Sequence, residues 1–383
     1  MQVLPPIPCK SLFKTGNWAA YLDSAAEGLP LQSSGGALAK YFSDKSLGSL
    51  GRPSMFEAEG DTARLAAGML GTSEQNVAFT GNATDALNLL GNSIQWRRGD
   101  RILITDLEFS SNVVCWLRLR EQGVKVEVIK SSHGIVELEQ FTSRLSSSTR
   151  LVSVSQVSYK TGTQFPYLRE LSREVHRAGA LFVVDATQAL GRVPVSVDGV
   201  DFLVASSYKW LLGVHGLGLV YCDPALLVEL KPGAAGWYSI TDAFAPDRFE
   251  EFTLRRGAAR FIGGMPNFPS LYVMRESLDL LTQMGVERID TYLKPLVRKL
   301  REGIASLGFR VLTPSEEAYA SGIVSFSHDA SEELGQALRD QGVIVWTGDG
   351  RVRASVHLYN DEADVETLLS CLENVQKLVG SLN

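Results

Sequence analysis

The chain has 383 residues, 45% of them hydrophobic and 21% charged, so it can bury a large core and is expected to fold into two globular domains of unequal size. A formal net charge of −6 provides no basic face for a phosphate backbone, which argues against nucleic acid as a partner. No apolar run reaches the roughly 20 residues needed to cross a bilayer, so we expect no membrane segment and a cytoplasmic location.

The first part of the chain predicts a large α/β domain with a mostly parallel seven-stranded sheet. Between about residues 60 and 225, short β-branched runs alternate with amphipathic stretches such as residues 166–178, a pattern typical of βαβ units. The expected strands comprise residues 76–80, 101–106, 125–129, 151–156, 181–185, 202–206 and 217–222.

A smaller C-terminal α/β domain is predicted after an irregular stretch. Residues 231–269 are rich in Gly, Pro and aromatic residues, and we expect them to cover the mouth of a site before a long helix begins near residue 270. We assign residues 17–265 to the large domain and residues 266–383, together with residues 1–16, to the small domain. The elements expected in the small domain are strands at 309–312, 322–327, 343–347 and 352–358 and a helix from 362 to about 378.

The first motif that indicates chemistry is Gly81-Asn82-Ala83-Thr84, a glycine turn and a helix start that follow an apolar strand. Free N–H groups at the start of a helix bind anions, and the Thr84 hydroxyl adds a donor, so a phosphate can bind there. Taken alone, an ordinary helix N-cap explains the same residues.

Two further motifs place charged side chains at the ends of buried strands. Asp185 ends an apolar strand, and ligands of α/β sheets bind at the carboxyl ends of strands, where a cationic ring nitrogen would satisfy a carboxylate. Lys209 follows the next strand, and an apolar or cationic pocket would expose the free amine that forms an imine. Each residue alone has an ordinary explanation as a cap or a surface charge. Together with the phosphate motif they match a cofactor that has a phosphate, a ring nitrogen and an aldehyde.

In this order, the motifs resemble the class V aminotransferases of pyridoxal 5′-phosphate (PLP) fold type I. That family includes cysteine desulfurases, selenocysteine lyases, cystine C-S lyases, isopenicillin epimerases and kynureninases. The resemblance implies a PLP-dependent enzyme that acts at the α-carbon of an amino acid, assembled as a homodimer with its sites at the interface. It covers nearly the whole chain through Tyr21-Leu22-Asp23-Ser24-Ala25-Ala26, Gly81-Asn82-Ala83-Thr84, Asp185-Ala186-Thr187-Gln188, Ser206-Ser207-Tyr208-Lys209 and Val352-Arg353-Ala354-Ser355.

The resemblance also implies roles for individual residues. Lys209 would hold the cofactor as a Schiff base and move protons at the α-carbon, Asp185 would keep the pyridine nitrogen protonated, and Gln188 would donate to the phenolic oxygen of the cofactor. Arg353 would bind the substrate α-carboxylate through its bidentate fork, with Ala25 also on the substrate side. The residues expected to hold the phosphate are Ala83, Thr84, Ser206 and Tyr208.

Three departures from the family pattern bear on specificity. Phe109 takes the position where desulfurases and lyases stack a His on the cofactor ring, and Phe cannot transfer a proton. Met265 stands where a Thr from the neighbouring subunit usually touches the phosphate, so we expect only a backbone contact there. Residues 345–351 lack the nucleophilic Cys of desulfurases, so persulfide-forming chemistry is not expected. No metal is expected either, because metal-ligand spacing is absent among the histidines and among the four cysteines, Cys9, Cys115, Cys222 and Cys371.

The sequence leaves alternatives open. Transamination and β-elimination begin alike, so an aminotransferase and a C-S lyase without a catalytic Cys, acting on cysteine, cystine or selenocysteine, are both consistent with the motifs. A noncatalytic scaffold protein with this fold is an alternative of another class, although the presence of Lys209, Asp185 and Arg353 argues against it. A nicotinamide dehydrogenase is not supported, because residues 213–218 lack the Gly-x-Gly-x-x-Gly order and precede a strand.

Overall fold

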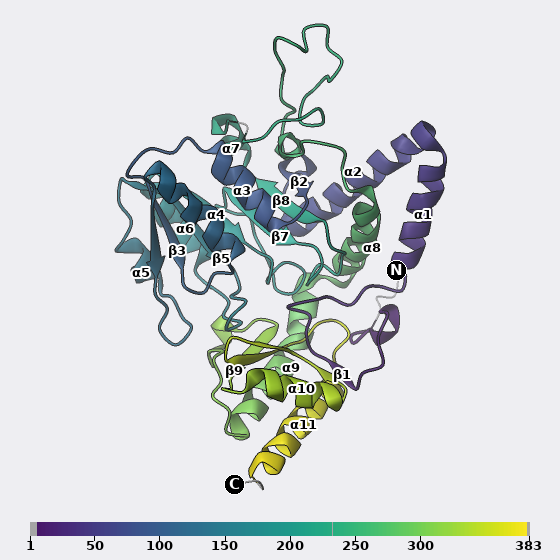
Figure 1. The fold of residues 1–383 in the computed structure, drawn as a ribbon, viewed down its shortest axis with the longest axis vertical. Helices are drawn as coiled ribbons and strands as arrows, with labels where there is room; N and C mark the ends of the chain where they lie inside the picture. Colours follow the sequence, from purple (N-terminus) through teal and green to yellow (C-terminus); the bar gives the residue numbers. More distant parts are fainter. Residues whose placement is uncertain (1–5, 232, 381–383) are drawn as a thin grey trace.

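The computed structural model describes residues 6–231 and 233–380, and its centre is a seven-stranded sheet with the strand order β2-β8-β7-β6-β5-β3-β4 (Figure 1). Strands β3 to β7 are parallel, and β8 runs antiparallel to both of its neighbours. The predicted mostly parallel seven-stranded sheet is therefore confirmed. The strands are β2 (Val77–Thr80), β3 (Arg101–Thr105), β4 (Lys125–Ile129), β5 (Thr149–Ser155), β6 (Leu181–Asp185), β7 (Phe202–Ser206) and β8 (Gly218–Cys222).

Both faces of this sheet are covered, which is why its central strands are apolar at nearly every position. Alternate residues of β6 belong to different core clusters, since Phe182 and Val184 pack on one face and Val183 packs on the other. Helices α3 (Ala83–Ser93) and α4 (Ser111–Leu117) cover the face of Val183, whereas α2 (Arg52–Leu70), α6 (Leu168–Arg177) and α8 (Phe268–Met284) cover the other.

Helix α8 packs on the first two long helices of the chain, α2 and α1 (Ser34–Ser46) (Figure 1). Thr62 of α2 donates to the Leu271 carbonyl at 3.2 Å, and the Tyr272 hydroxyl donates to Asp44 of α1 at 2.6 Å. The long helix predicted near residue 270 is thus present. The division of the chain at residues 265 and 266 stays a prediction.

A second, three-stranded antiparallel sheet has the order β11-β12-β9. Helices α9 (Val286–Ser306), α10 (Ser331–Asp340) and α11 (Glu362–Gly380) surround it at the lower end of the molecule (Figure 1). The predicted terminal helix begins at Glu362 as expected. The strands are β9 (Ile323–Ser327), β11 (Trp346–Gly348) and β12 (Arg351–Ser355).

Two strands predicted in this region are wrong. Residues 309–312 form only an isolated bridge between Val311 and Phe326, and the Leu312 and Thr313 N–H groups both donate to the Ser325 carbonyl instead of continuing a regular ladder. Residues 343–347 do not form one strand either. They split at Val345 into β10 (Val343–Ile344), which pairs with β1 (Ala20–Tyr21), and β11, which pairs with β12.

Residues 20–25 connect the small sheet to the large one. Strand β1 runs parallel to β10, the Ser355 N–H of β12 donates to Leu22 at 2.7 Å, and the Ser355 hydroxyl accepts from the Ala25 N–H at 2.9 Å. On the other side, the Ala25 carbonyl accepts from Gln188, which follows β6. This N-terminal segment therefore contacts both sheets.

The remaining elements are short. They are α5 (Leu138–Thr142), α7 (Pro224–Glu229), and the 3₁₀ helices η1 (Lys10–Leu12), η2 (Gly48–Gly51), η3 (Glu74–Asn76), η4 (Arg118–Gln122), η5 (Ala258–Phe261) and η6 (Glu317–Tyr319). In the described parts of the chain, no helix is both long and apolar enough to cross a membrane.

Candidate active site

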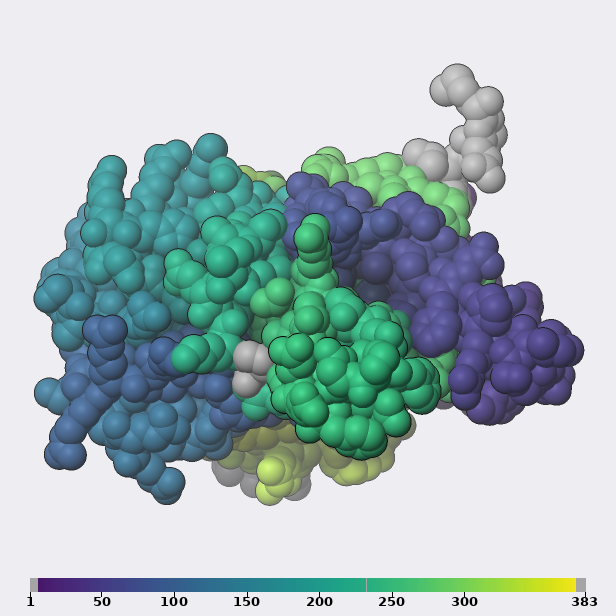
Figure 2. All heavy atoms as spheres, turned by 90° about the horizontal axis from the view of Figure 1, so that it is seen from above, coloured from purple at the N-terminus to yellow at the C-terminus, as the bar shows by residue number. Residues whose placement is uncertain are grey.

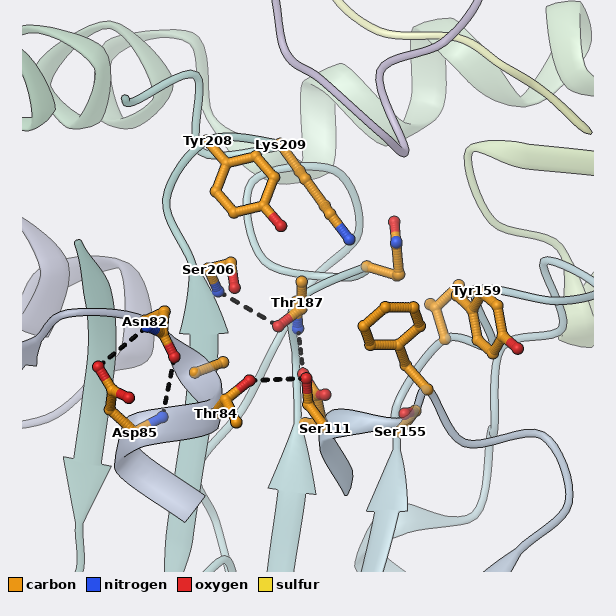
Figure 3. A pocket seen from close by; sticks show the side chains of 15 residues that line it. Asn82, Thr84, Asp85, Ser111, Ser155, Tyr159, Thr187, Ser206, Tyr208 and Lys209 are labelled. Atoms are coloured by element: carbon orange, nitrogen blue, oxygen red, sulfur yellow. Dashed lines mark hydrogen bonds between the residues drawn. The ribbon is translucent and has the colours of Figure 1, made fainter. Parts of the chain in front are cut away.

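A cavity of about 430 Å³ lies where the carboxyl ends of β5, β6 and β7 meet (Figure 3). This is the edge at which parallel sheets of α/β proteins bind ligands. The start of α3 closes one side, and the segments that follow β3, β5, β6 and β7 close the others. The lining residues are Asn82, Ala83, Thr84, Asp85, Phe109, Ser111, Ser155, Val157, Tyr159, Asp185, Thr187, Gln188, Ser206, Tyr208 and Lys209.

Lys209 extends its amine into the centre of this cavity (Figure 3). The residue is only 9% exposed, and its Nζ lies 5.5 Å from the centre of the Phe109 ring and 5.6 Å from that of Tyr208. Burial and the nearby Arg353 charge lower the pKa of Lys209 to about 8, against the opposing effect of Asp185. A substantial fraction of the amine is therefore neutral, and nucleophilic, at mildly alkaline pH.

The backbone under Lys209 is held by a close approach of the N-terminal segment. The Gly28 N–H donates to the Tyr208 carbonyl at 2.8 Å, and a Cβ at Gly28 would lie 2.1 Å from the Lys209 carbonyl oxygen. Only glycine fits at this contact. The N-terminal segment around Gly28 thus helps to place Lys209.

Asp185 is a buried carboxylate at the floor of the cavity. It is 5% exposed, and its Oδ1 accepts the Thr187 N–H at 2.9 Å. Burial raises the pKa of Asp185, while the Thr187 contact and the Lys209 charge oppose that rise. A cationic group bound beside this carboxylate would offset its desolvation, which is the demand that a protonated ring nitrogen meets.

A cluster of small polar groups lines the opposite end of the cavity (Figure 3). Asn82 caps α3 by accepting the Asp85 N–H at 2.9 Å, so Ala83 and Thr84 open the helix at the cavity wall. The Thr84 hydroxyl contacts that of Ser111 at 2.7 Å, and the Ser206 N–H donates to Thr187 at 3.2 Å. Helix-start N–H groups and hydroxyls suit a phosphate.

Gln188 is held in place by two hydrogen bonds. Its amide nitrogen donates to the Ala25 carbonyl at 3.0 Å, and its oxygen accepts the Trp210 indole N–H at 2.6 Å. One amide hydrogen of Gln188 is left to donate into the cavity. Ala25, predicted on the substrate side, lies behind Gln188 and is not a lining residue.

Arg353 is not a lining residue either, although it contacts one. Its Nη1 donates to the Tyr159 carbonyl at 3.0 Å, its Nη2 lies 3.9 Å from Asp23, and its Nε has no hydrogen-bond partner although buried. Burial lowers the pKa of Arg353 to about 10 and raises the pKa of Asp23 to about 7. The structure thus places this guanidinium beside the cavity, in contact with the backbone of the lining residue Tyr159.

Among the described residues of the stretch 231–269, none lines the cavity of its own chain, so the expectation that this stretch covers the mouth of a site stays a prediction. The middle of this stretch, around the exposed Phe244 and Phe249, extends as a loop from the end of the molecule opposite the small sheet (Figures 1 and 2), whereas Tyr238 and Ala258 on either side of it are buried. Met265 is 44% exposed and does not reach the cavity of its own chain. Its predicted contact depends on a second copy of the chain.

None of the four cysteines lines the cavity, and all are buried. Burial raises the pKa of the Cys9 thiol to about 11, and it also raises the pKa values of Cys115, Cys222 and Cys371. The connection between β11 and β12 is a tight turn at Gly348-Asp349-Gly350 without a thiol. In the described residues, no group of three His, Cys, Asp or Glu side chains is placed to hold a metal ion.

Sequence reasoning missed several residues that line the cavity. Ser155 is the last residue of β5, and Thr187 lies two residues after the end of β6. Small polar residues at the ends of buried strands were therefore the signal that could have identified them. Ser111, which pairs with Thr84, comes from the start of another helix and had no comparable signal.

The chain is similar to known proteins over nearly its whole length. It matches the family model described as Aminotransferase class-V over residues 20–368. A probable cysteine desulfurase of Methanothermobacter thermautotrophicus is 29% identical over 335 residues, which are 81% of each chain. The solved structure of a cysteine desulfurase from Thermococcus onnurineus NA1 has a TM-score of 0.87 at 25% identity and covers 98% of this chain and 99% of that one. The cystine C-S lyase C-DES, at 21% identity, covers 94% and 98% with a TM-score of 0.86, a likeness of fold.

Proposed function

This chain belongs to the class V aminotransferase family, and on that premise we propose that it is a PLP-dependent enzyme that moves protons at the α-carbon of an amino acid. When bound, PLP supplies an electron-withdrawing ring that stabilises negative charge at the α-carbon. The single observation that supports this function best is the buried Lys209 amine, which shares one cavity with the Asp185 carboxylate and the polar start of α3.

The cavity fits the three chemical demands of this cofactor. The first residues of α3, with Thr84 and Ser206, would hold the phosphate, and Asp185 would pair with the ring nitrogen. Gln188 has one amide hydrogen left for the phenolic oxygen, and Phe109 offers an apolar face to the ring. Tyr208, which also lines the cavity, is a further candidate for the phosphate.

Lys209 is the group that would carry the proton. Phe109 has no exchangeable proton, whereas the Lys209 amine, with its pKa lowered to about 8, can accept a proton from the substrate α-carbon and donate it again. Transamination needs only one such group, because the proton leaves one carbon and returns to a neighbouring one. We therefore place transamination first, with Arg353, which contacts the Tyr159 carbonyl beside the cavity, binding the α-carboxylate.

A second candidate is a C-S lyase that releases sulfur without a protein thiol. It is favoured by the cysteine desulfurases among the relatives. Because every cysteine is buried and outside the cavity, the sulfur would leave as a free thiol or sulfide and not as a persulfide on the enzyme.

We also propose that the protein works as a homodimer. Phe244 and Phe249, on the loop formed by residues 231–265, are each 86% exposed, and Phe252 is 58% exposed. Exposed aromatic residues gathered on one loop are typical of a surface that another chain covers. A second copy would bury them and would bring Met265 toward the neighbouring site.

The test is the visible absorption spectrum of the protein with PLP, before and after a panel of amino acids is added. We expect a cofactor band that Lys209→Ala abolishes, that the exposed Lys130→Ala control keeps, and that at least one amino acid changes. Keto acid formed together with the amine form of the cofactor identifies transamination, and pyruvate with released thiol identifies the lyase. Absence of a Lys209-dependent band, or a band that no amino acid changes, would favour the noncatalytic scaffold.

A further inference from the structure

Two buried arginines, Arg351 and Arg353, lie next to each other beside Tyr159, a residue that lines the cavity. Arg351 and Arg353 are 2% and 4% exposed, and alternate residues of a strand point to the same side, so both belong to one face of β12. Arg353 donates to the Tyr159 carbonyl, and the Arg351 guanidinium lies 5.4 Å from the centre of the Tyr159 ring. Both guanidiniums therefore contact the same lining residue.

Trp346 lies close to both guanidiniums, which are shielded from water. The Trp346 ring centre lies 5.0 Å from the Arg351 guanidinium carbon and 5.1 Å from that of Arg353. Two like charges beside one aromatic ring in a buried place repel each other and lose hydration. Such an arrangement is stabilised when anions bind to it.

The anions that the chain itself provides leave donors free. The Nε atoms of Arg351 and Arg353 are buried without a hydrogen-bond partner, and the Asp23 carboxylate is 3.9 Å from Arg353, beyond hydrogen-bonding distance. Arg351 pairs with Asp349, but the Asp349 side chain is 71% exposed and sits in a glycine turn with a left-handed φ of 53°. The Asp349 carboxylate can therefore turn into solvent, where its charge is hydrated.

We propose that Arg351 binds a second anionic group of the substrate, so the amino acid processed at this site carries an acidic side chain, as aspartate and glutamate do. The inference rests on the proposed function, in which Arg353 binds the α-carboxylate. The Cα atoms of residues two apart on a strand are separated by about 7 Å, and both guanidinium carbons lie close to one Trp346 ring, 5.0 and 5.1 Å from its centre. Two guanidiniums placed together in this way suit two carboxylates joined by a short aliphatic chain. Asp349 occupies the place of the distal carboxylate until substrate displaces it.

The test compares acids with their amides on the PLP-loaded protein. We expect kcat/KM for L-aspartate or L-glutamate to exceed that for L-asparagine or L-glutamine. Arg351→Gln should lower the value for the acids by on the order of ten- to a hundredfold and leave the amides within about twofold. Asp349→Asn should lower KM for the acids. Arg339→Gln, which removes an exposed arginine of α10, is the control and should change neither value.

Equal rates with acids and amides, or an Arg351→Gln variant that loses activity toward both alike, would overturn the inference while the proposed function stands. A binding experiment tests the Arg351 inference separately if the proposed function itself fails. If no amino acid reacts, calorimetry with succinate and propionate still tests the anion site. Tighter binding of succinate that depends on Arg351 supports it, and equal binding of the two acids overturns it.

Discussion

The indole N–H of Trp210 donates to the side-chain oxygen of Gln188 at 2.6 Å, which fixes the direction in which the Gln188 amide presents its hydrogens. Trp210→Phe would leave that buried oxygen unpaired. We expect it to destabilise the fold by about 1–3 kcal/mol and to shift the absorption band of bound PLP. Urea unfolding and the visible spectrum measure the two effects.

Trp96→Phe is the matched control for this substitution. The Trp96 indole also donates a hydrogen bond, to the Gly91 carbonyl at 2.7 Å, but Trp96 does not line the cavity. Its replacement should lower stability and leave the cofactor spectrum as it is. If both variants shift the band alike, Trp210 has no specific role in orienting Gln188.

The lowered pKa of Lys209 predicts a pH-dependent stability in the cofactor-free protein. The unfolded chain binds a proton at Lys209 up to about pH 10.5, whereas the folded chain loses it near pH 8, so the free energy of unfolding rises with pH between these values. Relative to Lys209→Met, wild type should gain about 3 kcal/mol across this window. Urea unfolding of both proteins from pH 7.5 to 10.5 gives the difference, and a flat difference would contradict the lowered pKa.

Asp185→Asn should remove the charge that keeps the cofactor nitrogen protonated. Because this partner is buried and preorganised, we expect kcat to fall by on the order of a hundredfold or more, with PLP still bound through Lys209. Stopped-flow absorbance with a reactive amino acid measures the step. Asp201→Asn is the control, since Asp201 is also shielded from solvent but pairs with His176 outside the cavity. A similar loss in both variants would contradict the assigned role.

Gly28→Ala should displace Lys209, because the new methyl group would lie 2.1 Å from the Lys209 carbonyl oxygen. We expect PLP occupancy, measured by absorbance after gel filtration, to fall severalfold, together with a lower melting temperature. Gly36→Ala in α1 meets nothing within 4 Å and should stabilise the protein by about 0.5–1 kcal/mol. Full occupancy in Gly28→Ala would show that the segment does not place the lysine.

The parts of the fold that sequence predicts well are those with a local cause. The seven strands follow from apolar runs that are buried on both faces. Asp185 could be predicted because it ends one of those runs, and Lys209 because it lies three residues after the end of the next. The switch at Val345 has no such cause, because it depends on pairing with β1, more than 300 residues earlier in the chain. Arg351 shows the same limit. Its sequence neighbours mark a strand, but only the tertiary fold places it against Tyr159 and Trp346.

Residues 20–25 make the position of the small sheet and the position of Gln188 interdependent. The Leu22 and Ala25 backbone atoms are bonded to β12, and the Ala25 carbonyl is bonded to Gln188 at the cavity. A rotation of the small sheet that opens a path for substrate would move residues 20–25 and turn the Gln188 amide with them. We therefore expect that, when substrate enters, the hydrogen bond from Gln188 to the phenolic oxygen of the cofactor weakens in the same motion.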